Sequence, residues 1–375
     1  MSVRAGATIL MTADTLGGVW SYAIDLARAL AVHDFRVILA AMGGPLSPAQ
    51  RRDAATIEGL VVHESDYRLE WMDDPWDDVA RAGDWLLSLE ERARPDIVHI
   101  NGFAHAALPF RAPRIAVVHS CVLSWWSAVR GEEAPRRYDR YRREVQAGLR
   151  VAGAVIAPTH AMLSEAARRY GPFRRSFVVP NAASAARHRP ADKEGFILAV
   201  GRLWDDAKNI SALCEVAERL PWPVVVAGSD EHPDLGKRSF RGVRMLGILD
   251  RDEVAAWMAR ASIYALPARY EPFGLSVLEA ALSGCALTLG DIPSLREIWG
   301  GAGALFVDPR SIEQMESALR LLIEAPELRL EMAREARARA LEHTPERMAR
   351  GYLDIYEARV SEASADEETQ EEPCA

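Results

Sequence analysis

Cysteine is scarce in this 375-residue chain: there are four, they lie far apart, and no two form a C-x-x-C pair. Such sparse cysteines exclude a disulfide scaffold and a C-x-x-C zinc site, and they are typical of reduced, buried thiols. Long apolar runs are missing too, since no stretch reaches the roughly 18 residues that a bilayer span requires. The apolar run before Asp14 is too short for the core of a secretion signal. We therefore expect a cytoplasmic protein.

Basic charge is also in deficit, with 45 lysines and arginines against 54 acidic residues and a formal net charge of -9. This balance argues against a nucleic-acid partner. The turn after the first expected strand lacks the G-x-G-x-x-G motif of dinucleotide dehydrogenases. An Asp-x-Asp triplet at 250–252 offers metal ligands, but it precedes a helical segment, where Asp250 is better explained as the N-terminal cap. We expect no metal and no bound cofactor.

What the chain does have is a regular alternation of short apolar runs, typical of buried strands, with segments of helical periodicity. Such alternation predicts parallel sheets covered by helices. It is interrupted at 181–195, a stretch of small and polar residues, which predicts two Rossmann-like α/β domains, 1–185 and 186–344. A helix is expected at about 345–361, followed by an acidic tail over 362–375. Ligands of open α/β sheets bind beyond the carboxyl ends of the strands, so we expect the chemistry in a cleft between the domains.

The most informative motif is 264–284, YALPARYEPFGLSVLEAALSG. An expected strand leads into a loop that carries Glu271 and contains proline and glycine, and helical periodicity begins at Leu275. The first-turn amides from Gly274 to Val277 then point outward at the positive end of the helix dipole, which makes an anion site suited to a phosphate. Glu279 lies about one turn inside the helix, where its carboxylate can accept hydrogen bonds from a ribose.

A pair of basic residues follows another expected strand, in AVGRLWDDAKN at 199–209. Arg202 offers a bidentate guanidinium fork and Lys208 a compact charge, the combination expected around a diphosphate leaving group. Taken alone, such an arginine and lysine are ordinary surface charges. Their position after a strand and before the two glutamates favours the diphosphate role.

The first half of the chain contributes weaker candidates. Gly17 and Gly18 lie in a turn after the first expected strand and permit close backbone approach to a ligand, with a plain tight turn as the alternative. His119 ends an apolar run, where its imidazole can face the cleft and hydrogen-bond a ligand; a core histidine bonded to backbone is the alternative. Trp125 and Trp126 follow, either to stack on an acceptor ring or to pack.

The segment EPFGLSVLEA, in which Glu271 and Glu279 form an E-x7-E pattern, resembles the donor-site signature of retaining glycosyltransferases of family 4. The resemblance covers roughly residues 7–323 and implies the GT-B fold, in which two Rossmann-like domains face a cleft and the last helix packs back on the first domain. It also implies a nucleoside-diphosphate sugar as donor, a hydroxyl group of a sugar, lipid-linked glycan or small molecule as acceptor, and no metal. From the residues alone, a capped amphipathic helix with surface glutamates remains the alternative.

The resemblance further implies a role for each candidate. Arg202 and Lys208 would neutralise the departing nucleoside diphosphate, although Lys208 lies one residue further along than in the commoner form of the motif. Glu271 would hold hydroxyls of the donor sugar and Glu279 the ribose, while His119 would contact the sugar from the opposite domain. The predicted catalytic residues are His119, Arg202, Lys208 and Glu271. The predicted donor-binding residues are Gly17, Gly18, Phe273, Gly274, Leu275, Ser276 and Glu279.

Two other functions fit part of this pattern. A sugar-nucleotide epimerase of the same fold would share the donor site but release its product without an acceptor. A two-lobed solute-binding protein would share the twin domains, but it needs an export signal and gives no reason for Arg202 with the two glutamates. Separately, residues 130–150 carry seven arginines and four acidic residues. They form either a solvated helix face or a peripheral contact with anionic lipid at the inner face of a membrane.

Overall fold

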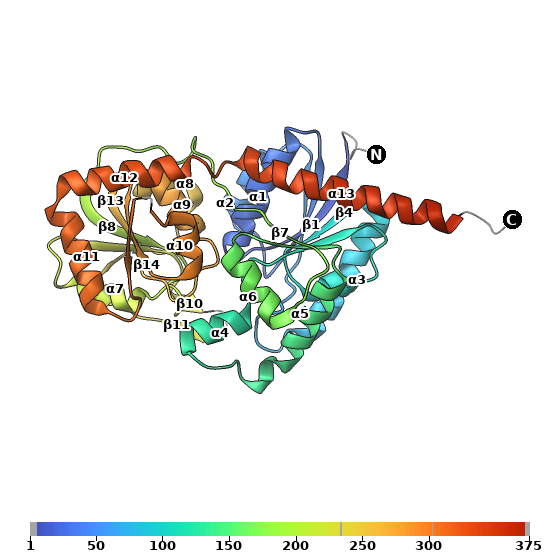
Figure 1. Ribbon diagram of the computed structural model, residues 1–375, viewed down its shortest axis with the longest axis horizontal. Coiled ribbons are helices and arrows are strands. Elements are labelled where there is room, and N and C mark those ends of the chain that lie inside the picture. Colours follow the sequence, from blue (N-terminus) through green and yellow to red (C-terminus); the bar gives the residue numbers. More distant parts are fainter. Residues whose placement is uncertain (1–5, 233–234, 302, 372–375) are drawn as a thin grey trace. The chain divides into compact units, whose positions relative to one another are not determined.

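The computed structural model describes residues 6–232, 235–301 and 303–371, and its internal contacts divide the chain into two units (Figure 1). The first unit contains the chain up to residue 123, residues 134–180 and the chain from residue 345 onward. The second contains residues 181–344 together with the short segment 124–133. Each unit has its own parallel sheet with helices around it, as the alternation of apolar runs and helical segments predicts.

In the first unit, seven parallel strands lie in the order β3-β2-β1-β4-β5-β6-β7. The central strands are buried along almost their whole length, which is typical of parallel sheets. The strands are β1 (Thr8–Asp14), β2 (Arg36–Met42), β3 (Leu60–Glu64), β4 (Ile97–Ile100), β5 (Arg114–Val117), β6 (Ala154–Ala157) and β7 (Ser176–Val178). The helices are α1 (Gly18–Ala31), α2 (Pro48–Ala55), α3 (Trp76–Ala93), the 3-10 turns η1 (Ala104–Ala107) and η2 (Arg136–Tyr138), α5 (Asp139–Val151), α6 (His160–Tyr170) and α13 (Pro345–Glu371).

In the second unit, six parallel strands lie in the order β12-β9-β8-β13-β14-β15, beside a small antiparallel ribbon. The sheet strands are β8 (Glu194–Val200), β9 (Val224–Ala227), β12 (Arg244–Met245), β13 (Ala261–Leu266), β14 (Ala286–Gly290) and β15 (Ala304–Val307). The ribbon pairs β10 (Glu231–His232) with β11 (Gly236–Lys237). The helices are α7 (Ile210–Ala217), α8 (Arg251–Arg260), α9 (Leu275–Leu282), α10 (Pro293–Trp299), α11 (Ile312–Glu324) and α12 (Pro326–Ala340). Helix α4 (Val122–Arg130) starts in the first unit and ends in the second.

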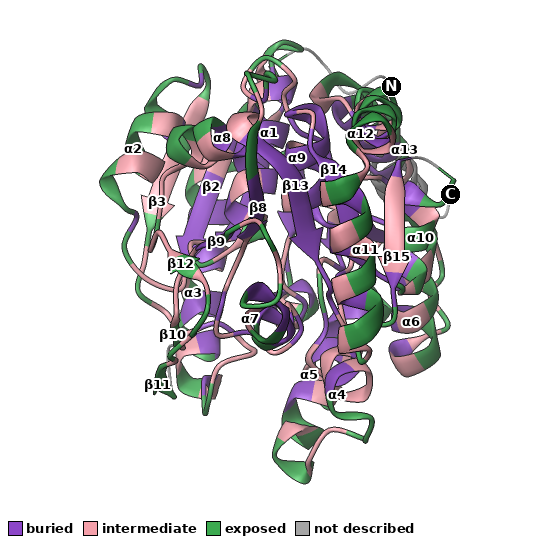
Figure 2. Cartoon of the chain, turned by 90° about the vertical axis from the view of Figure 1, so that its left-hand side faces the viewer, coloured by how far each residue is buried: buried purple, intermediate pink, exposed green. Residues whose placement is uncertain are grey.

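Strand β13 shows how the second core is organised. All six of its residues are buried, and Figure 2 shows β13 and its neighbour β14 as buried strands. Successive side chains of a strand point to opposite faces. Tyr264 and Leu266 accordingly join one apolar cluster, while Ile263 and Ala265 join another. Apolar contacts on both faces hold the carboxyl end of β13 in place, and the loop that carries Glu271 leaves from there.

The C-terminal helix α13 packs against α1 in the first unit, which confirms the predicted return of the last helix to the first domain. Its anchor is aromatic: Tyr352 and Tyr356 are fully buried, and the Tyr356 hydroxyl lies 2.6 Å from Nδ1 of His99 at the end of β4. The helix runs to Glu371, through part of the segment predicted to be an acidic tail. Alanine, glutamate and glutamine are good helix formers, which explains the continuation.

Residues 372–375 of the predicted tail lie outside the described part of the chain. Asp250 caps α8 by accepting hydrogen bonds from the backbone N–H groups of Asp252 and Glu253, as the sequence predicts. Within the described residues, every helix is too short or too polar to cross a bilayer. The same residues contain no group of three or more histidine, cysteine, aspartate or glutamate side chains that is arranged to hold a metal ion.

Tyr356→Phe tests the anchor of α13. The variant removes the hydroxyl that pairs with His99 and leaves a buried polar atom without its partner, which typically costs about 1–3 kcal/mol. We expect the free energy of unfolding, measured by urea denaturation with circular dichroism, to fall by that amount. Asp354→Asn, at an exposed position of the same helix, should change it by less than about 0.5 kcal/mol. Equal effects of the two variants would contradict the anchoring role.

Candidate functional site

Two loops meet at one edge of the second sheet. Strands β8 and β13 are parallel neighbours, so the loops that follow them, 201–209 and 267–274, leave the same edge. Hydrogen bonds tie these loops together: the Arg269 N–H donates to the Ala207 carbonyl at 2.8 Å, and the Asn209 side chain donates to the Pro267 carbonyl at 3.0 Å. The loop that carries the predicted basic pair and the loop that carries Glu271 are therefore held side by side.

Glu271 connects three parts of this edge through its carboxylate and its backbone carbonyl. Its side chain is 10% exposed, and one carboxylate oxygen forms an ion pair with Lys208 Nζ at 2.5 Å. The other oxygen accepts a hydrogen bond at 3.0 Å from the backbone N–H of Gly274, the residue just before α9. Gly274 has a φ of 90°, a conformation that other residues rarely adopt, and an added Cβ would press against Val277 and Leu295.

The amino end of α9 offers two open amides. The helix begins at Leu275, as predicted, but fewer backbone N–H groups are open to an anion than was expected for Gly274 to Val277. The Gly274 N–H is bonded to Glu271, and the Val277 N–H donates to the Gly274 carbonyl. Among the described residues, the N–H groups of Leu275 and Ser276 have no acceptor. They remain directed away from the helix, where the dipole favours an anion.

Arg202 follows β8 and is 37% exposed, so its guanidinium is accessible. It lies 5.2 Å from the ring centroid of Trp204, and one of its nitrogens contacts Asp205 Oδ2 at 3.2 Å. Both predicted basic residues therefore already face a carboxylate: Arg202 faces Asp205, and Lys208 faces Glu271. An incoming diphosphate would have to compete with these carboxylates for the two cations.

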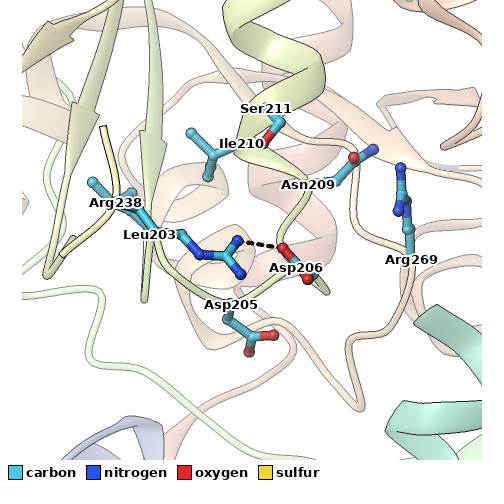
Figure 3. Close-up of a pocket in the computed structure, with 8 residues that line it drawn as sticks. All are labelled: Leu203, Asp205, Asp206, Asn209, Ile210, Ser211, Arg238 and Arg269. Carbon is cyan, nitrogen blue, oxygen red and sulfur yellow. Dashed lines mark hydrogen bonds and ion pairs between the residues drawn. The ribbon is translucent and has the colours of Figure 1, made fainter. Parts of the chain in front are cut away.

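Asp205 and Asp206 were not among the predicted site residues. Asp205 is 5% exposed and accepts a hydrogen bond at 2.8 Å from the indole N–H of Trp125 on α4. This hydrogen bond was not predicted, and it fixes the indole N–H of Trp125 on a protein acceptor. Asp206 pairs with Arg130 at 2.7 Å and with Arg238. A small pocket lies beside this loop (Figure 3), and it is lined by Leu203, Asp205, Asp206, Asn209, Ile210, Ser211, Arg238 and Arg269.

Two predicted donor-binding side chains are turned into the fold. The Phe273 ring is 2% exposed and packs edge-on against His343 in the core of the second unit. The Ser276 hydroxyl lies 2.7 Å from the hydroxyl of the buried Tyr264. Any donor contact by the buried Phe273 would thus have to come from its backbone.

Glu279 lies beside a histidine that the sequence analysis missed. His188 is 2% exposed, in the stretch 181–195 of small and polar residues that was predicted to separate the domains, and its Nε2 lies 3.9 Å from Glu279 Oε1. That distance is too long for a hydrogen bond, and neither ring nitrogen has another partner in the described part of the chain. Burial, aided by the positive charges of Arg251 and Arg187, lowers the pKa of His188 to about 3. The imidazole is therefore neutral near pH 7.

The predicted site residues of the first unit follow the carboxyl ends of β1 and β5, which lie on either side of β4 in its sheet. Gly17 and Gly18 lead into α1, which has no side-chain cap. His119 follows β5, and its Nε2 lies 2.8 Å from Oδ1 of Asn101, which follows β4. The Asn101 amide nitrogen donates to the Thr12 carbonyl at 2.7 Å, so its oxygen must be the acceptor.

This hydrogen bond assigns the proton of His119 to Nε2 and leaves Nδ1 as an acceptor. The His119 ring also lies edge-on to Tyr22, with ring centroids 4.4 Å apart, and burial lowers the pKa of His119 to about 3. His119 thus has side-chain partners, in contrast to the alternative of a core histidine bonded to backbone. Asn101 was not predicted, although its place after an apolar run, like that of His119, is the signal that identifies it.

Comparisons with known proteins match both halves of the chain to glycosyltransferase families. Residues 16–187 match the model of the Glycosyltransferase Family 4, and residues 181–339 match that of the Glycosyl transferases group 1. A glycogen synthase of Mycobacterium tuberculosis is 28% identical over 363 residues, which is 86% of this chain and 86% of that protein. A phosphatidyl-myo-inositol mannosyltransferase of Propionibacterium freudenreichii is 35% identical over 116 residues, which is 30% of this chain and 29% of that protein.

Solved structures show the same fold at low identity. A sucrose-phosphate synthase from Thermosynechococcus elongatus superposes with a TM-score of 0.76 at 16% identity, covering 93% of this chain and 98% of that one. Anabaena HepE, solved in complex with UDP-glucose, superposes with a TM-score of 0.71 at 16% identity, covering 96% and 99%. The architecture is therefore GT-B.

Because His188 is buried as a neutral imidazole, we expect the free energy of unfolding to fall in acid. Its pKa of about 3 lies below the ordinary value near 6.5, so the unfolded chain takes up the proton first, and stability falls as the pH drops through this window. At pH 5 one such histidine costs about 2 kcal/mol relative to pH 7. We expect His188→Leu to reduce the drop in unfolding free energy between pH 7 and pH 5 by about that amount. His33→Leu, at an exposed histidine, is the control; an unchanged drop in His188→Leu would refute the assignment.

Proposed function

Because the chain is a glycosyltransferase with the GT-B fold, we propose that it transfers a sugar from a nucleoside-diphosphate donor to a hydroxyl acceptor, with retention and without a metal. One observation carries the proposal: Arg202, Lys208 and the two open amides of α9 belong to loops that leave a single sheet edge of the second unit. Two cations and two unpaired N–H donors suit a diphosphate.

The donor's diphosphate would be the group on which catalysis acts. As the glycosidic bond breaks, negative charge grows on the phosphate that leaves. Arg202, Lys208 and the N–H groups of Leu275 and Ser276 would stabilise that charge, because the hydrogen bonds between the two loops hold their backbones close together at one sheet edge. This preorganised electrostatic contribution is expected to be the largest part of the rate enhancement.

The remaining roles in the proposal follow the resemblance to family 4. Glu271 would hold hydroxyls of the transferred sugar, Glu279 the ribose, and His119 would contact the sugar through a neutral imidazole. Retention requires the acceptor hydroxyl to attack on the face that the phosphate leaves, with a phosphate oxygen accepting the proton. Gly17 and Gly18 would permit close backbone approach to the ligand. The orientation of His119 by Asn101 supports a defined hydrogen-bonding role for its ring.

The relatives support a nucleotide sugar without selecting one. The Anabaena HepE structure contains UDP-glucose, and the mycobacterial relative is named a glycogen synthase. We extend from them only a hexosyl donor of the nucleoside-diphosphate type and a place in glycan or glycoconjugate biosynthesis, in the cytoplasm. A sugar-nucleotide epimerase is distinguished by its product, because it would form an isomer or free sugar in the absence of any acceptor.

Nucleoside diphosphates provide the direct test of the donor site. A ligand that binds only the native state stabilises it, by about 2.7 kcal/mol at a hundredfold excess over its Kd. We expect one of UDP, ADP or GDP to raise the melting temperature of the wild type. Arg202→Ala should lose most of that shift and the transferase activity, while keeping its own melting temperature without ligand. If no nucleoside diphosphate shifts the wild type, the donor site is wrong.

A peripheral contact with anionic lipid is a separate proposal for helix α5 and the residues before it. Tyr141, Val145 and Leu149 are buried, whereas Arg136 and Arg143 are exposed. Each basic residue near an anionic surface contributes about 1 kcal/mol. We expect co-sedimentation with phosphatidylserine vesicles but not with neutral ones, and a drop of about tenfold or more in R136E/R143E. Equal sedimentation of the variant and the wild type would overturn the proposal.

A further inference from the structure

Asp205 occupies an unexpected position for an acidic residue. It lies three residues after Arg202, in the loop to which the diphosphate role is assigned, and it is 5% exposed. A fixed negative charge beside an anion site opposes anion binding. Its presence there requires a reason other than donor affinity.

The carboxylate of Asp205 is held in one orientation. Oδ1 accepts hydrogen bonds from the Trp125 indole N–H at 2.8 Å and from the Ala207 backbone N–H at 3.0 Å. These two donors leave Oδ2 facing Arg202, whose nitrogen lies 3.2 Å away. Trp125 is itself supported, since the Arg130 guanidinium lies 5.4 Å from its ring centroid. The neighbouring groups therefore orient the Asp205 carboxylate so that it pairs with Arg202.

The neighbouring Asp206 shows a contrasting arrangement. Its carboxylate pairs with Arg130 at 2.7 Å and also with Arg238 (Figure 3), and no contact with Arg202 is present among the described residues. These partners outweigh the effect of burial and lower the pKa of Asp206. The same loop therefore carries two carboxylates of equal charge, of which one is bound to Arg202 and the other to different arginines.

We propose that Asp205 competes with the diphosphate for Arg202, and that this competition weakens binding of the nucleoside-diphosphate product and speeds its release. The inference rests on the proposed donor site. When the diphosphate is bound, the five donors of the guanidinium turn from the carboxylate to the phosphate oxygens. After sugar transfer the carboxylate takes Arg202 back, so the product leaves a site whose positive charge is already neutralised.

Asp205→Asn tests the competition by the sign of its effect. Asparagine keeps an acceptor oxygen for Trp125 and Ala207 but removes the charge that faces Arg202. Half-exposed ion pairs contribute up to about 1 kcal/mol, so we expect the Kd of the nucleoside diphosphate found by thermal shift, measured by calorimetry, to fall about two- to fivefold. The inhibition constant of the product should fall by the same factor. A residue that only supports the loop would instead weaken binding when it is replaced.

Asp206→Asn is the matched control, because it removes an equal charge from the same loop and should leave the Kd within a factor of about two. Asp205→Ser is a second variant in case the asparagine disturbs the loop, with circular dichroism and melting temperature as the check on folding. In the double variant with Arg202→Ala, Asp205→Asn should no longer lower the Kd, because its effect depends on the interaction between the two residues. A gain that persists without Arg202 would overturn the inference.

The two levels of the proposal fail in different ways. If the wild type binds no nucleoside diphosphate, the proposed function fails and this inference fails with it. If the wild type binds one and Asp205→Asn binds it equally or more weakly, the donor site stands and only the competition is overturned. The same conclusion follows if Asp206→Asn tightens binding as much as Asp205→Asn does.

Discussion

The carboxylate of Glu271 is the feature on which the loops after β8 and β13 and the start of α9 depend. With one oxygen it neutralises Lys208, and with the other it accepts the backbone N–H of Gly274. The first contact joins the loop after β8 to the loop after β13, and the second fixes the start of α9. Because Gly274 needs a left-handed backbone to make this turn, the two open amides that follow it have a defined direction. A single buried acid thus orders the cation, the loop and the helix end together.

The positive charges of the candidate site are paired with carboxylates when no ligand is bound. Lys208 is paired with Glu271 and Arg202 with Asp205. Such pairing lowers the cost of keeping cations in a partly buried position, and it also limits how tightly an anion can be held. With the proposed nucleoside-diphosphate donor, moderate affinity is an advantage, since tight binding of the product would slow turnover.

Much of this could be predicted from local signals. Apolar runs identified strands such as β8 and β13, and the loop with proline and glycine followed by helical periodicity located the start of α9 at Leu275. Asp250 was identified as a helix cap because it directly precedes a segment of helical periodicity. In each case the signal and the structure that it predicts lie within a few residues of each other. The GT-B fold itself came from the resemblance, since alternation alone predicts only parallel sheets.

The contacts that were missed join residues distant in sequence. Trp125 and Asp205 are 80 positions apart, and nothing near either residue indicates the other. His188 lies in a segment of small and polar residues that looks like a linker, and its burial depends on the packing of the whole second unit. The Phe273 ring belongs to a binding motif and yet fills the core, because a motif does not specify which way each side chain turns.

The most direct test of the account is a crystal structure of the protein with the nucleoside diphosphate that stabilises it. We expect phosphate oxygens at hydrogen-bond distance, about 2.7–3.2 Å, from the N–H groups of Leu275 and Ser276, with Arg202 turned from Asp205 toward the phosphate. A nucleotide bound with its phosphates away from these amides, or an Arg202 that keeps Asp205 as its partner, would contradict it.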